Sequence, residues 1–329
     1  MLRYPGLSEL YLATLRDVCG AYEYRSAPRG HAEREIIGYG ARIDDPRARF
    51  CRHAARKQNV VFNYAEALWY LSGRNDLEFI AHYAPSMARY SPDGKHLPGT
   101  GYGARLLHYG ERGLDQIERA LDILSRDDAE SKRVVLQIFS ADEELYRRNI
   151  DVSCTLGLQL LLREGRLHMV AFMRANDAYI GLLNDVFSFT FLQEYLASRL
   201  GCELGTYAHQ VGSIHVYDDN LPRVQALLDD SDAAIVTAAA PPRMPAGTRA
   251  ATIARVLEHE GRIRAGRVSL AALRDIDLDP YWRDVLGLFW IYREIKAGNP
   301  PPDEALAFVG SFHRAYLMNR WDMASASLQ

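Results

Sequence analysis

A cysteine stands at the entrance of an apolar run in DVSCTLGLQL, residues 151–160, between two hydroxyl residues. Cysteine statistics alone favour a small apolar core residue for Cys154. A thiol at the polar end of such a run also suits a nucleophile, provided that cations or hydrogen-bond donors lower its pKa. Arg174 could supply the cation if residues 155–174 form a hairpin.

Acidic side chains lie within two apolar segments. Glu66 interrupts VFNYAEALWYLS, residues 61–72. A solvated position on the polar side of a helix is the commoner outcome for such a residue. A buried carboxyl would have a raised pKa, which suits general acid or base catalysis. In RANDAYIGLLND, Asn184 or Asp185 is expected to cap the helix that follows, with the preceding polar residues in a loop.

Hydrophobic periodicity and turn residues predict the elements that position these side chains. We expect one α/β (α+β) domain over residues 1–329, with a helical C-terminal region at about 248–329. The predicted elements are helix 7–19, strand 35–43, helix 61–72, a Gly/Pro loop over 90–103, helix 113–125, strand 133–139, a hairpin over 155–174 turning at Glu164 and Gly165, helix 183–200 ended by Gly201, strand 213–217, and helices near 248–260, 283–297 and 302–316.

Composition excludes several classes of protein. The net charge of −3 gives no bulk attraction to nucleic acid. No stretch approaches the roughly 20 apolar residues of a membrane helix, and the first 20 residues lack the apolar core of a signal peptide. The four cysteines form no CxxC pair and no metal-binding pattern. We therefore expect a cytoplasmic protein without a metal site, a membrane partner or a nucleic-acid partner.

Taken in order, several of these segments resemble the thymidylate synthase family, from about residue 29 to residue 217. The resemblance implies a large mixed β-sheet with surrounding helices, and a homodimer in which the two sheets pack together and the sites are shared. The segments that carry it are AEALWYLSG, GTGYG, SKRVV, Cys154 followed by Gln159, RANDAYIGLLND, Ser188, and His215-Val216-Tyr217.

The resemblance also implies a role for each matching residue. In the family, a thiolate attacks C6 of a pyrimidine nucleotide, and C5 then takes a one-carbon unit from 5,10-methylenetetrahydrofolate. Cys154 is the implied nucleophile; Glu66 organises proton transfers through water; Arg174 binds phosphate near the thiolate; Lys132 and Arg133 reach the phosphate of the neighbouring subunit; His215 and Tyr217 hold the sugar hydroxyl; Gln159 and Ser188 position the nucleotide; Asp177 and Gly181 face the folate; Tyr102 is the loop tyrosine; and Arg29 matches the mobile phosphate-binding arginine.

Asp185 departs from the family pattern, because the synthases that act on uracil have Asn there. Cytosine reverses the hydrogen-bonding edge of uracil, and a carboxyl group can accept from its amine and donate to N3. Mismatch at a buried polar contact can discriminate by as much as ~10⁴–10⁵. Asp at this place is the pattern of the family's cytidylate hydroxymethylases, so we expect cytosine as the base.

Other departures concern the final step. Leu183 and Asn184 replace the family's Pro and aromatic residue, APSMARYS lacks the expected tryptophan, and the chain ends in MASASLQ. These features of the methylating enzymes exclude water and support hydride transfer. Their loss favours water as the final nucleophile and a 5-hydroxymethyl product.

The phosphate site differs as well. Lys132 stands for an Arg and Ala175 for a Ser, which removes a bidentate fork and a hydroxyl donor. A shifted phosphate and sugar would make room for a 2′-hydroxyl. Together with similarity to hydroxymethylases of nucleoside-antibiotic pathways, this predicts CMP rather than dCMP as the substrate.

Four alternatives stay open at this point. The chain could hydroxymethylate dCMP instead of CMP. The chain could be a thymidylate synthase that methylates dUMP, which Asp185 disfavours. It could be a non-catalytic nucleotide- or RNA-binding protein, which the retention of Cys154 and Glu66 disfavours. An unrelated cysteine hydrolase using Cys154 and His215 has a compatible order of residues but no oxyanion motif.

Overall fold

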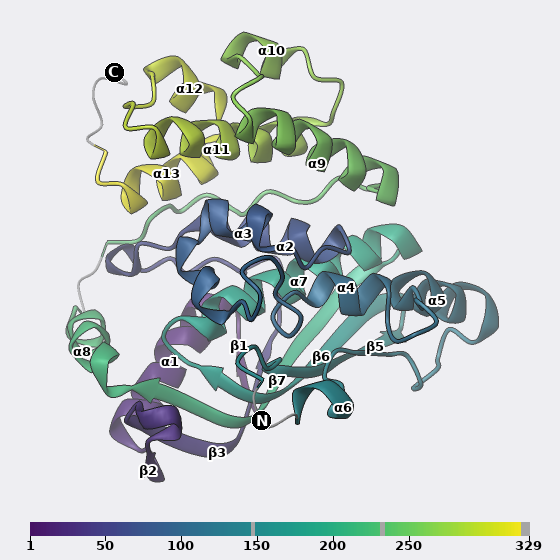
Figure 1. The fold of residues 1–329 in the computed structure, drawn as a ribbon, viewed down its shortest axis with the longest axis vertical. Helices are drawn as coiled ribbons and strands as arrows, with labels where there is room; N and C mark the ends of the chain where they lie inside the picture. The colour runs from purple at the N-terminus through teal and green to yellow at the C-terminus, as the bar shows by residue number, and fades with distance from the viewer. Residues whose placement is uncertain (146–148, 231–233, 324–329) are drawn as a thin grey trace.

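A mixed seven-stranded β-sheet forms the base of the protein (Figure 1). The computed structural model describes residues 1–145, 149–230 and 234–323. The strand order is β1-β3-β7-β6-β5-β4, with β2 paired to β3, and the pairs β1–β3 and β6–β7 are parallel. The strands are β1 (Leu2–Tyr4), β2 (Tyr24–Ser26), β3 (Glu33–Ile43), β4 (Val135–Gln137), β5 (Thr155–Arg163), β6 (Arg166–Asp177) and β7 (Glu203–Tyr217). The large mixed sheet expected from the sequence is confirmed.

The predicted hairpin is confirmed as β5 and β6. It turns at Glu164 and Gly165, whose φ angles of 50° and 70° lie in the left-handed region that a tight hairpin turn requires. Leu158 and Leu160 on β5 are buried, whereas Gln159 between them is partly exposed. This alternation places one face of the hairpin against the helices and leaves the other face open.

The sequence predicted only the last part of β7, residues 213–217. The strand begins at Glu203, and its first half, ELGTYAHQVG, contains small and polar residues instead of an apolar run. That half is nevertheless a strand because β3 and β6 pair with it on both sides. Tertiary pairing therefore overrides the weak local preference.

Helices cover one face of the sheet in two layers (Figure 1). α1 (Leu7–Gly20) and α7 (Gly181–Leu200) lie on the strands, and α2 (Val60–Leu71) packs on α7. Every residue of α2 except Phe62 is buried. The remaining helices are α3 (Leu77–Tyr83), α4 (Tyr102–Leu107), α5 (Gln116–Asp122), α6 (Ala141–Glu144), α8 (Leu221–Asp229), α9 (Ala250–Arg264), α10 (Leu270–Arg274), α11 (Pro280–Lys296), α12 (Asp303–Phe308) and α13 (Ser311–Arg320).

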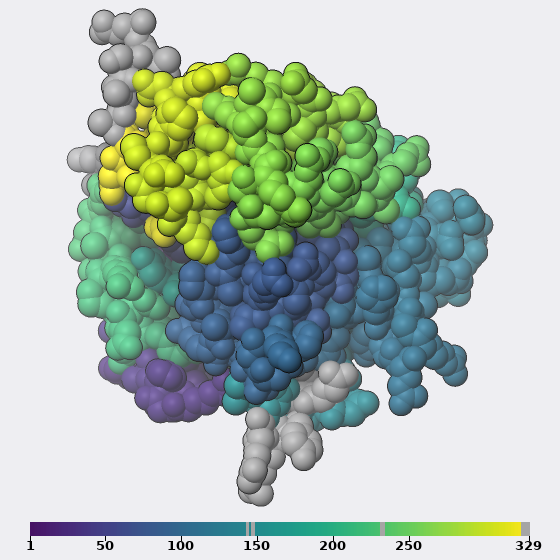
Figure 2. All heavy atoms as spheres, turned by 45° about the horizontal axis from the view of Figure 1, so that its top comes forward, coloured from purple at the N-terminus to yellow at the C-terminus, as the bar shows by residue number. Residues whose placement is uncertain are grey.

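The helices α9 to α13 lie over α2 and α3, on the side away from the sheet (Figures 1 and 2). Tyr64 on α2 shares a hydrogen bond of 2.8 Å with Nε2 of buried His313 on α13, and Nδ1 of His313 contacts Asp284 on α11. The C-terminal helices thus close over the helix that carries Glu66.

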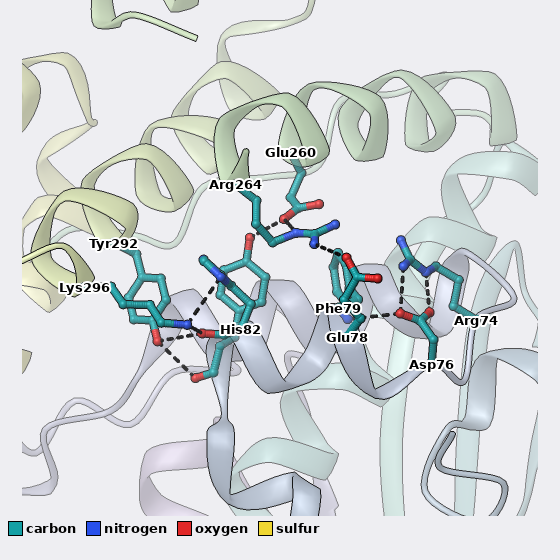
Figure 3. A network of polar contacts seen from close by, with 10 residues as sticks. Arg74, Asp76, Glu78, Phe79, His82, Glu260, Arg264, Tyr292 and Lys296 are labelled. Carbon is teal, nitrogen blue, oxygen red and sulfur yellow. Dashed lines mark hydrogen bonds and ion pairs between the residues drawn. The ribbon is translucent and has the colours of Figure 1, made fainter. Parts of the chain in front are cut away.

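A second polar contact joins α9 to α3 (Figure 3). The Tyr83 hydroxyl donates to Oε1 of Glu260 at 2.6 Å, and Nε of Arg264 donates to the same oxygen at 2.9 Å. The Glu260 side chain is 1% exposed, so both donors are needed to compensate the burial of its charge. Arg264 also reaches Glu78, whose side chain is 82% exposed.

The two carboxylates on Arg264 should differ sharply in their effect on stability. We expect Glu260→Ala to lower the free energy of unfolding by about 3 kcal/mol, because it leaves the buried Tyr83 hydroxyl without its acceptor and Arg264 with only the exposed carboxylate of Glu78. Glu78→Ala, the matched control, should cost less than about 1 kcal/mol because that ion pair is exposed. Urea unfolding followed by tryptophan fluorescence measures both; equal losses would show that burial does not set the strength of this contact.

Candidate active site

Cys154 lies directly before β5, beside Arg174 on the neighbouring strand β6. The Arg174 backbone N–H donates to the Cys154 carbonyl at 2.8 Å, and Nη2 lies 3.9 Å from Sγ. The guanidinium is held by the carbonyls of Ser153 and Val152 at 2.8 and 3.1 Å. Nη1 has no hydrogen-bond partner within the described ranges, so it is open to an anion.

Burial raises the pKa of the Cys154 thiol to about 11. Arg174 and Arg29 act in the opposite direction and lower it, while Asp185 raises it further. Arg29 therefore lies close enough to act on the sulfur, although its match to the family pattern is loose in sequence. The thiol is mostly protonated in the free protein at neutral pH.

Glu66 is buried, so its expected solvated position is wrong. The Ser188 hydroxyl on α7 donates to Oε2 of Glu66 at 2.9 Å, and the Tyr70 hydroxyl also hydrogen-bonds the carboxyl. Burial, and secondly the nearby Asp185, raise the pKa of Glu66 to about 8. A carboxyl with such a pKa can both give and take a proton near neutrality.

Asp185 does not cap α7, and neither does Asn184, because the helix already begins at Gly181. The residue that shapes the helix entry is Asp177, whose Oδ1 accepts from the backbone N–H groups of Tyr179 and Ile180 at 2.8 and 3.3 Å. The N-cap prediction, which local rules alone favoured, is wrong because residues 181–184 already form the first turn of the helix.

The Asp185 carboxyl instead points at Asn176, whose Nδ2 donates to Oδ2 at 2.7 Å. Burial raises the pKa of Asp185 to about 7; the hydrogen bond from Asn176 opposes this rise and Asp177 adds to it. Asp185 is partly exposed, and its Oδ1 has no hydrogen-bond partner in the part of the chain that the structure describes. One carboxyl oxygen is therefore held, and the other is open to a ligand.

Two aromatic groups complete the surroundings of the thiol. Tyr102 stacks on Tyr70 with ring centroids 4.9 Å apart, and its hydroxyl accepts from Thr155 at 3.2 Å. Tyr217 lies 5.0 Å from the ring of His215, and burial raises its pKa to about 12, with Glu33, Asp177 and then Cys154 adding to the rise.

The structure gathers most of the predicted site residues in one place. These residues form two groups. The members of the first are connected by contacts and by mutual electrostatic effects, and the members of the second lie together further along the sheet. The first group comprises Cys154, Glu66, Asp185, Arg29, Tyr102, Arg174, Asp177, Ser188, His215 and Tyr217, with Ala175 next to Arg174 in the chain and Gly181 close to Asp177 and Asp185 in space; the second comprises Lys132, Arg133 and Gln159.

In the second group, Nε2 of Gln159 donates to the Lys132 carbonyl at 2.8 Å, and Arg133 pairs with Asp127 at 3.3 Å. No contact that the described residues make connects Gln159 to the thiol. The prediction that Gln159 positions the nucleotide thus gains no support within one chain. Lys132 and Arg133 are exposed, as basic groups offered to a partner must be.

Several polar residues at the site were not singled out from the sequence. Glu33 on β3 is buried, its Oε1 accepts from Ser26 at 2.9 Å, and Oε2 lies 3.8 Å from Nε2 of His215. His209 contacts Asn176 at 3.0 Å, and Nδ2 of Asn63 donates to Asn184 at 2.8 Å. Asn176 and Asn184 did carry a signal, since both lie in the segment RANDAYIGLLND that the sequence marked.

The carboxyl group of Asp177 is suited to holding a folate. Its Oδ1 is used by backbone donors, the carboxyl is partly exposed, and Oδ2 has no partner among the described side chains. An open carboxylate oxygen fits the N–H donors of a pterin ring. In the described ranges there is no cluster of three or more metal-ligating side chains, and no helix is long and apolar enough to cross a membrane.

Several known proteins are similar in sequence to this chain. Three similar proteins each carry the name deoxyuridylate hydroxymethyltransferase. That of Pseudomonas phage M6 is 34% identical over 187 residues, which cover 56% of this chain and 52% of the relative. The values are 29% over 203 residues for Bacillus phage SP01, covering 59% and 53%, and 31% over 187 residues for Delftia phage PhiW-14, covering 53% and 50%.

The chain therefore spans about half the length of these curated relatives. A family model described as thymidylate synthase matches residues 9–240, which include every residue of both groups above and end before α9. This match covers well over half of the chain. With a thiol, an arginine, a buried carboxyl and a partly exposed carboxyl placed together on a large mixed sheet, the protein belongs to the thymidylate synthase family.

Proposed function

We propose that this protein transfers a hydroxymethyl group to C5 of cytidine 5′-monophosphate. The observation that carries the proposal is the open carboxyl of Asp185 in the same site as the Cys154 thiol and the Glu66 carboxyl. The thiol attacks C6, and this attack gives C5 the electron density that it needs to form a carbon–carbon bond. The names of the three similar proteins support hydroxymethyl over methyl as the group transferred.

Cys154 must lose its proton to attack. With a pKa of about 11, about one thiol in ten thousand is ionised at pH 7. Arg174 stabilises the thiolate that forms, since its Nη2 lies 3.9 Å from the sulfur. Glu66, with a pKa of about 8, takes and returns protons through water during the later steps.

Asp185 selects the base. A carboxyl oxygen can accept from the exocyclic amine of cytosine in either protonation state. Uracil offers the acceptor O4 at that position, and N3–H in place of the acceptor N3 of cytosine. Because the pKa of Asp185 is about 7, much of the carboxyl keeps its proton at physiological pH and can donate it to N3 of cytosine.

The sugar and phosphate contacts favour the ribonucleotide. Arg174 offers Nη1 to the phosphate, and Ala175 beside it has no hydroxyl to add. Lys132 gives a single charged point where an arginine would give a fork. A phosphate held by fewer donors can shift and leave room for a 2′-hydroxyl near His215 and Tyr217.

5,10-methylenetetrahydrofolate would supply the one-carbon unit that C5 receives. Asp177 would hold its pterin ring through the open carboxyl oxygen, and the close packing at Gly181 keeps the helix entry tight. A Cβ at Gly181 would lie 2.8 Å from Nδ2 of Asn176, so no larger residue fits there without a shift. Water completes the product; the MASASLQ tail on which part of this inference depends lies mostly outside the described residues.

A second candidate is hydroxymethylation of deoxyuridylate. The printed names of the three similar proteins favour it, and a protonated Asp185 could donate to O4 of uracil while its other oxygen accepts from N3–H. The hydrolase alternative has less support, since no hydrogen bond between Cys154 and His215 occurs in the described structure.

We further propose that two chains pack through the open face of the sheet, and that residues 1–329 fold as one unit with the C-terminal helices. Val135, Gln159 and Val170 lie opposite one another on three adjacent strands, so they share a face. Phe172, two residues further along β6, lies on the same face and is 38% exposed. The basic residues Lys132 and Arg133 would then reach the partner's phosphate.

The products distinguish the candidates for function. We expect CMP with the folate to gain the mass of formaldehyde, with faster turnover than dCMP and little reaction of dUMP. Asp185→Asn should lower cytidylate turnover by at least about a hundredfold and raise uridylate turnover. Mass spectrometry of the products measures both effects.

Two outcomes of this experiment contradict the proposal. A methylene mass gain would indicate methylation, and preferred turnover of dUMP by the natural chain would favour the second candidate. Nucleotide binding without tritium release from [5-³H]CMP would indicate a non-catalytic binding protein.

The proposed dimer should depend on Phe172. A charge at this position has to be desolvated when the two sheets pack, so Phe172→Asp should yield monomers at about 10 μM. Ile235→Asp is the matched control, because Ile235 is 54% exposed but lies outside the sheet. Size-exclusion chromatography with light scattering measures the mass; a dimeric Phe172→Asp variant would contradict this interface.

The thiol chemistry predicts slow, strongly pH-dependent alkylation. Iodoacetamide should label Cys154 at a rate that rises toward a midpoint near pH 11, and Arg174→Met should slow labelling at pH 8 about tenfold by removing the nearby cation. Peptide mass spectrometry separates Cys154 from the other three cysteines, and Cys154→Ser is the control. Equal rates with and without Arg174 would mean that it does not stabilise the thiolate.

A further inference from the structure

A buried chain of hydrogen bonds runs from β7 to the carboxyl of Asp185. The Tyr207 hydroxyl contacts Nδ1 of His209 at 2.8 Å, and Nε2 of His209 contacts Oδ1 of Asn176 at 3.0 Å. Nδ2 of Asn176 donates to Oδ2 of Asp185 at 2.7 Å. Tyr207 and His209 are fully buried, and Asn176 is 2% exposed.

All the hydrogen bonds in this series are donated in the same direction, from Tyr207 toward Asp185. If Tyr207 donates to His209, then Nε2–H of His209 donates to Asn176, and the amide N–H of Asn176 donates to Asp185. In the opposite direction, the Tyr207 proton would have no acceptor among the described residues, which is unfavourable for a buried hydroxyl. Burial lowers the pKa of His209 to about 3, so the ring is neutral and has one donor and one acceptor, as this direction requires.

We propose that Tyr207, His209 and Asn176 are positioning residues that keep Oδ2 of Asp185 an acceptor and thereby put the carboxyl proton on Oδ1, which faces the nucleotide base. The inference rests on the proposed function, in which Asp185 meets the base. It concerns groups whose side chains need not touch the substrate. It applies to cytosine, whose N3 is unprotonated and can accept the proton from Oδ1.

The chemical consequence concerns the step in which sulfur bonds to C6. The electron pair of the thiolate displaces the ring π electrons toward N3, and the proton on Oδ1 moves to N3. Asp185 becomes a carboxylate, and Asn176 stabilises the new charge through its N–H donor on Oδ2. The proton is therefore transferred from Oδ1, and the carboxylate that remains is stabilised by a hydrogen bond at Oδ2.

Other titratable groups face Asp185 from each neighbouring element. Glu66 and Tyr70 come from α2, Tyr102 from α4, Cys154 from the start of β5, Asp177 from the end of β6 and Tyr207 from β7. Burial raises the pKa values of all six groups, that of Glu66 to about 8, and none of the six hydrogen-bonds Asn176 in the described structure. A change in the hydrogen bond from Asn176 should therefore appear mainly in the titration of Asp185 itself.

The test compares two variants of similar size at position 209. The amide of His209→Gln can accept from Tyr207 and donate to Asn176, so it preserves the direction of the chain. His209→Leu interrupts the chain and frees Asn176 to rotate, which removes a donor from the carboxylate. A carboxylate that loses a donor has a higher pKa. Tyr207→Phe removes the first donor, and Tyr39→Phe is its control because it removes a buried hydroxyl that bonds Thr14 outside the chain.

Two readouts decide the proposal. Infrared pH titration, with Asp185→Asn as the reference, locates the carboxyl proton without any substrate. We expect the natural chain, His209→Gln and Tyr39→Phe to titrate near pH 7, and His209→Leu and Tyr207→Phe to titrate about one pH unit higher. In turnover of CMP, the decline of kcat/KM above pH 7 should move in the same direction, with kcat/KM at pH 7 about tenfold lower.

Unchanged titration in both His209→Leu and Tyr207→Phe, or equal shifts in His209→Gln and His209→Leu, would overturn the proposal. Tyr207→Phe keeps the aromatic ring, so it tests the chain even if His209→Leu does not fold. If the natural chain turned over no pyrimidine nucleotide while the infrared shifts appeared as expected, the proposed function would fail and the positioning chain would stand.

Discussion

Desolvation of three ionisable groups in one small site is the constraint on which the rest depends. Burial is the largest influence on the pKa values of Cys154, Glu66 and Asp185, and it raises all three. The pKa of each group is thereby near or above neutral pH, so that each group can exchange a proton during a reaction. The same burial strengthens the effect of each neighbouring hydrogen-bond donor or charge on these pKa values, because the local dielectric constant is low.

The fold satisfies this constraint by bringing together elements that are distant in sequence. α7 crosses from β6 to β7 and lies on both strands, so its first turn, with Asp185, lies beside the end of β6. α2 packs on α7 and brings Glu66 against Ser188. The thiol lies just before β5, across from Arg174 on β6. Each group thus lies on or beside a regular element, which fixes its position better than a loop could.

The C-terminal helices contribute to the same burial from the other side. They lie outside the family match, yet they cover α2 and α3 (Figure 2), and His313 hydrogen-bonds Tyr64 two residues before Glu66. A helix with so little exposed surface is restrained on both sides. The helix that carries Glu66 is therefore packed between two layers of structure, only one of which belongs to the part shared with the family.

The sequence by itself determined the local elements with strong patterns and the types of residue in the site. The hairpin turn at Glu164 and Gly165, the helix ended by Gly201 and the ordered segments around Cys154 were all readable, because turn chemistry and periodicity are local properties. The first half of β7 was not readable, since small and polar residues form a strand there only when neighbours pair with them on both sides.

Only the tertiary structure decided which polar residues are buried and which partners they meet. Local residue statistics favoured solvent for Glu66 and a helix cap for Asp185, and only the family resemblance assigned both to a site; the structure places the two carboxyls close together. His209 and Glu33 gave no signal, because their importance comes from contacts across strands rather than from spacing along the chain. A pKa depends on desolvation and on charges within a few ångströms, and neither can be read from a one-dimensional pattern.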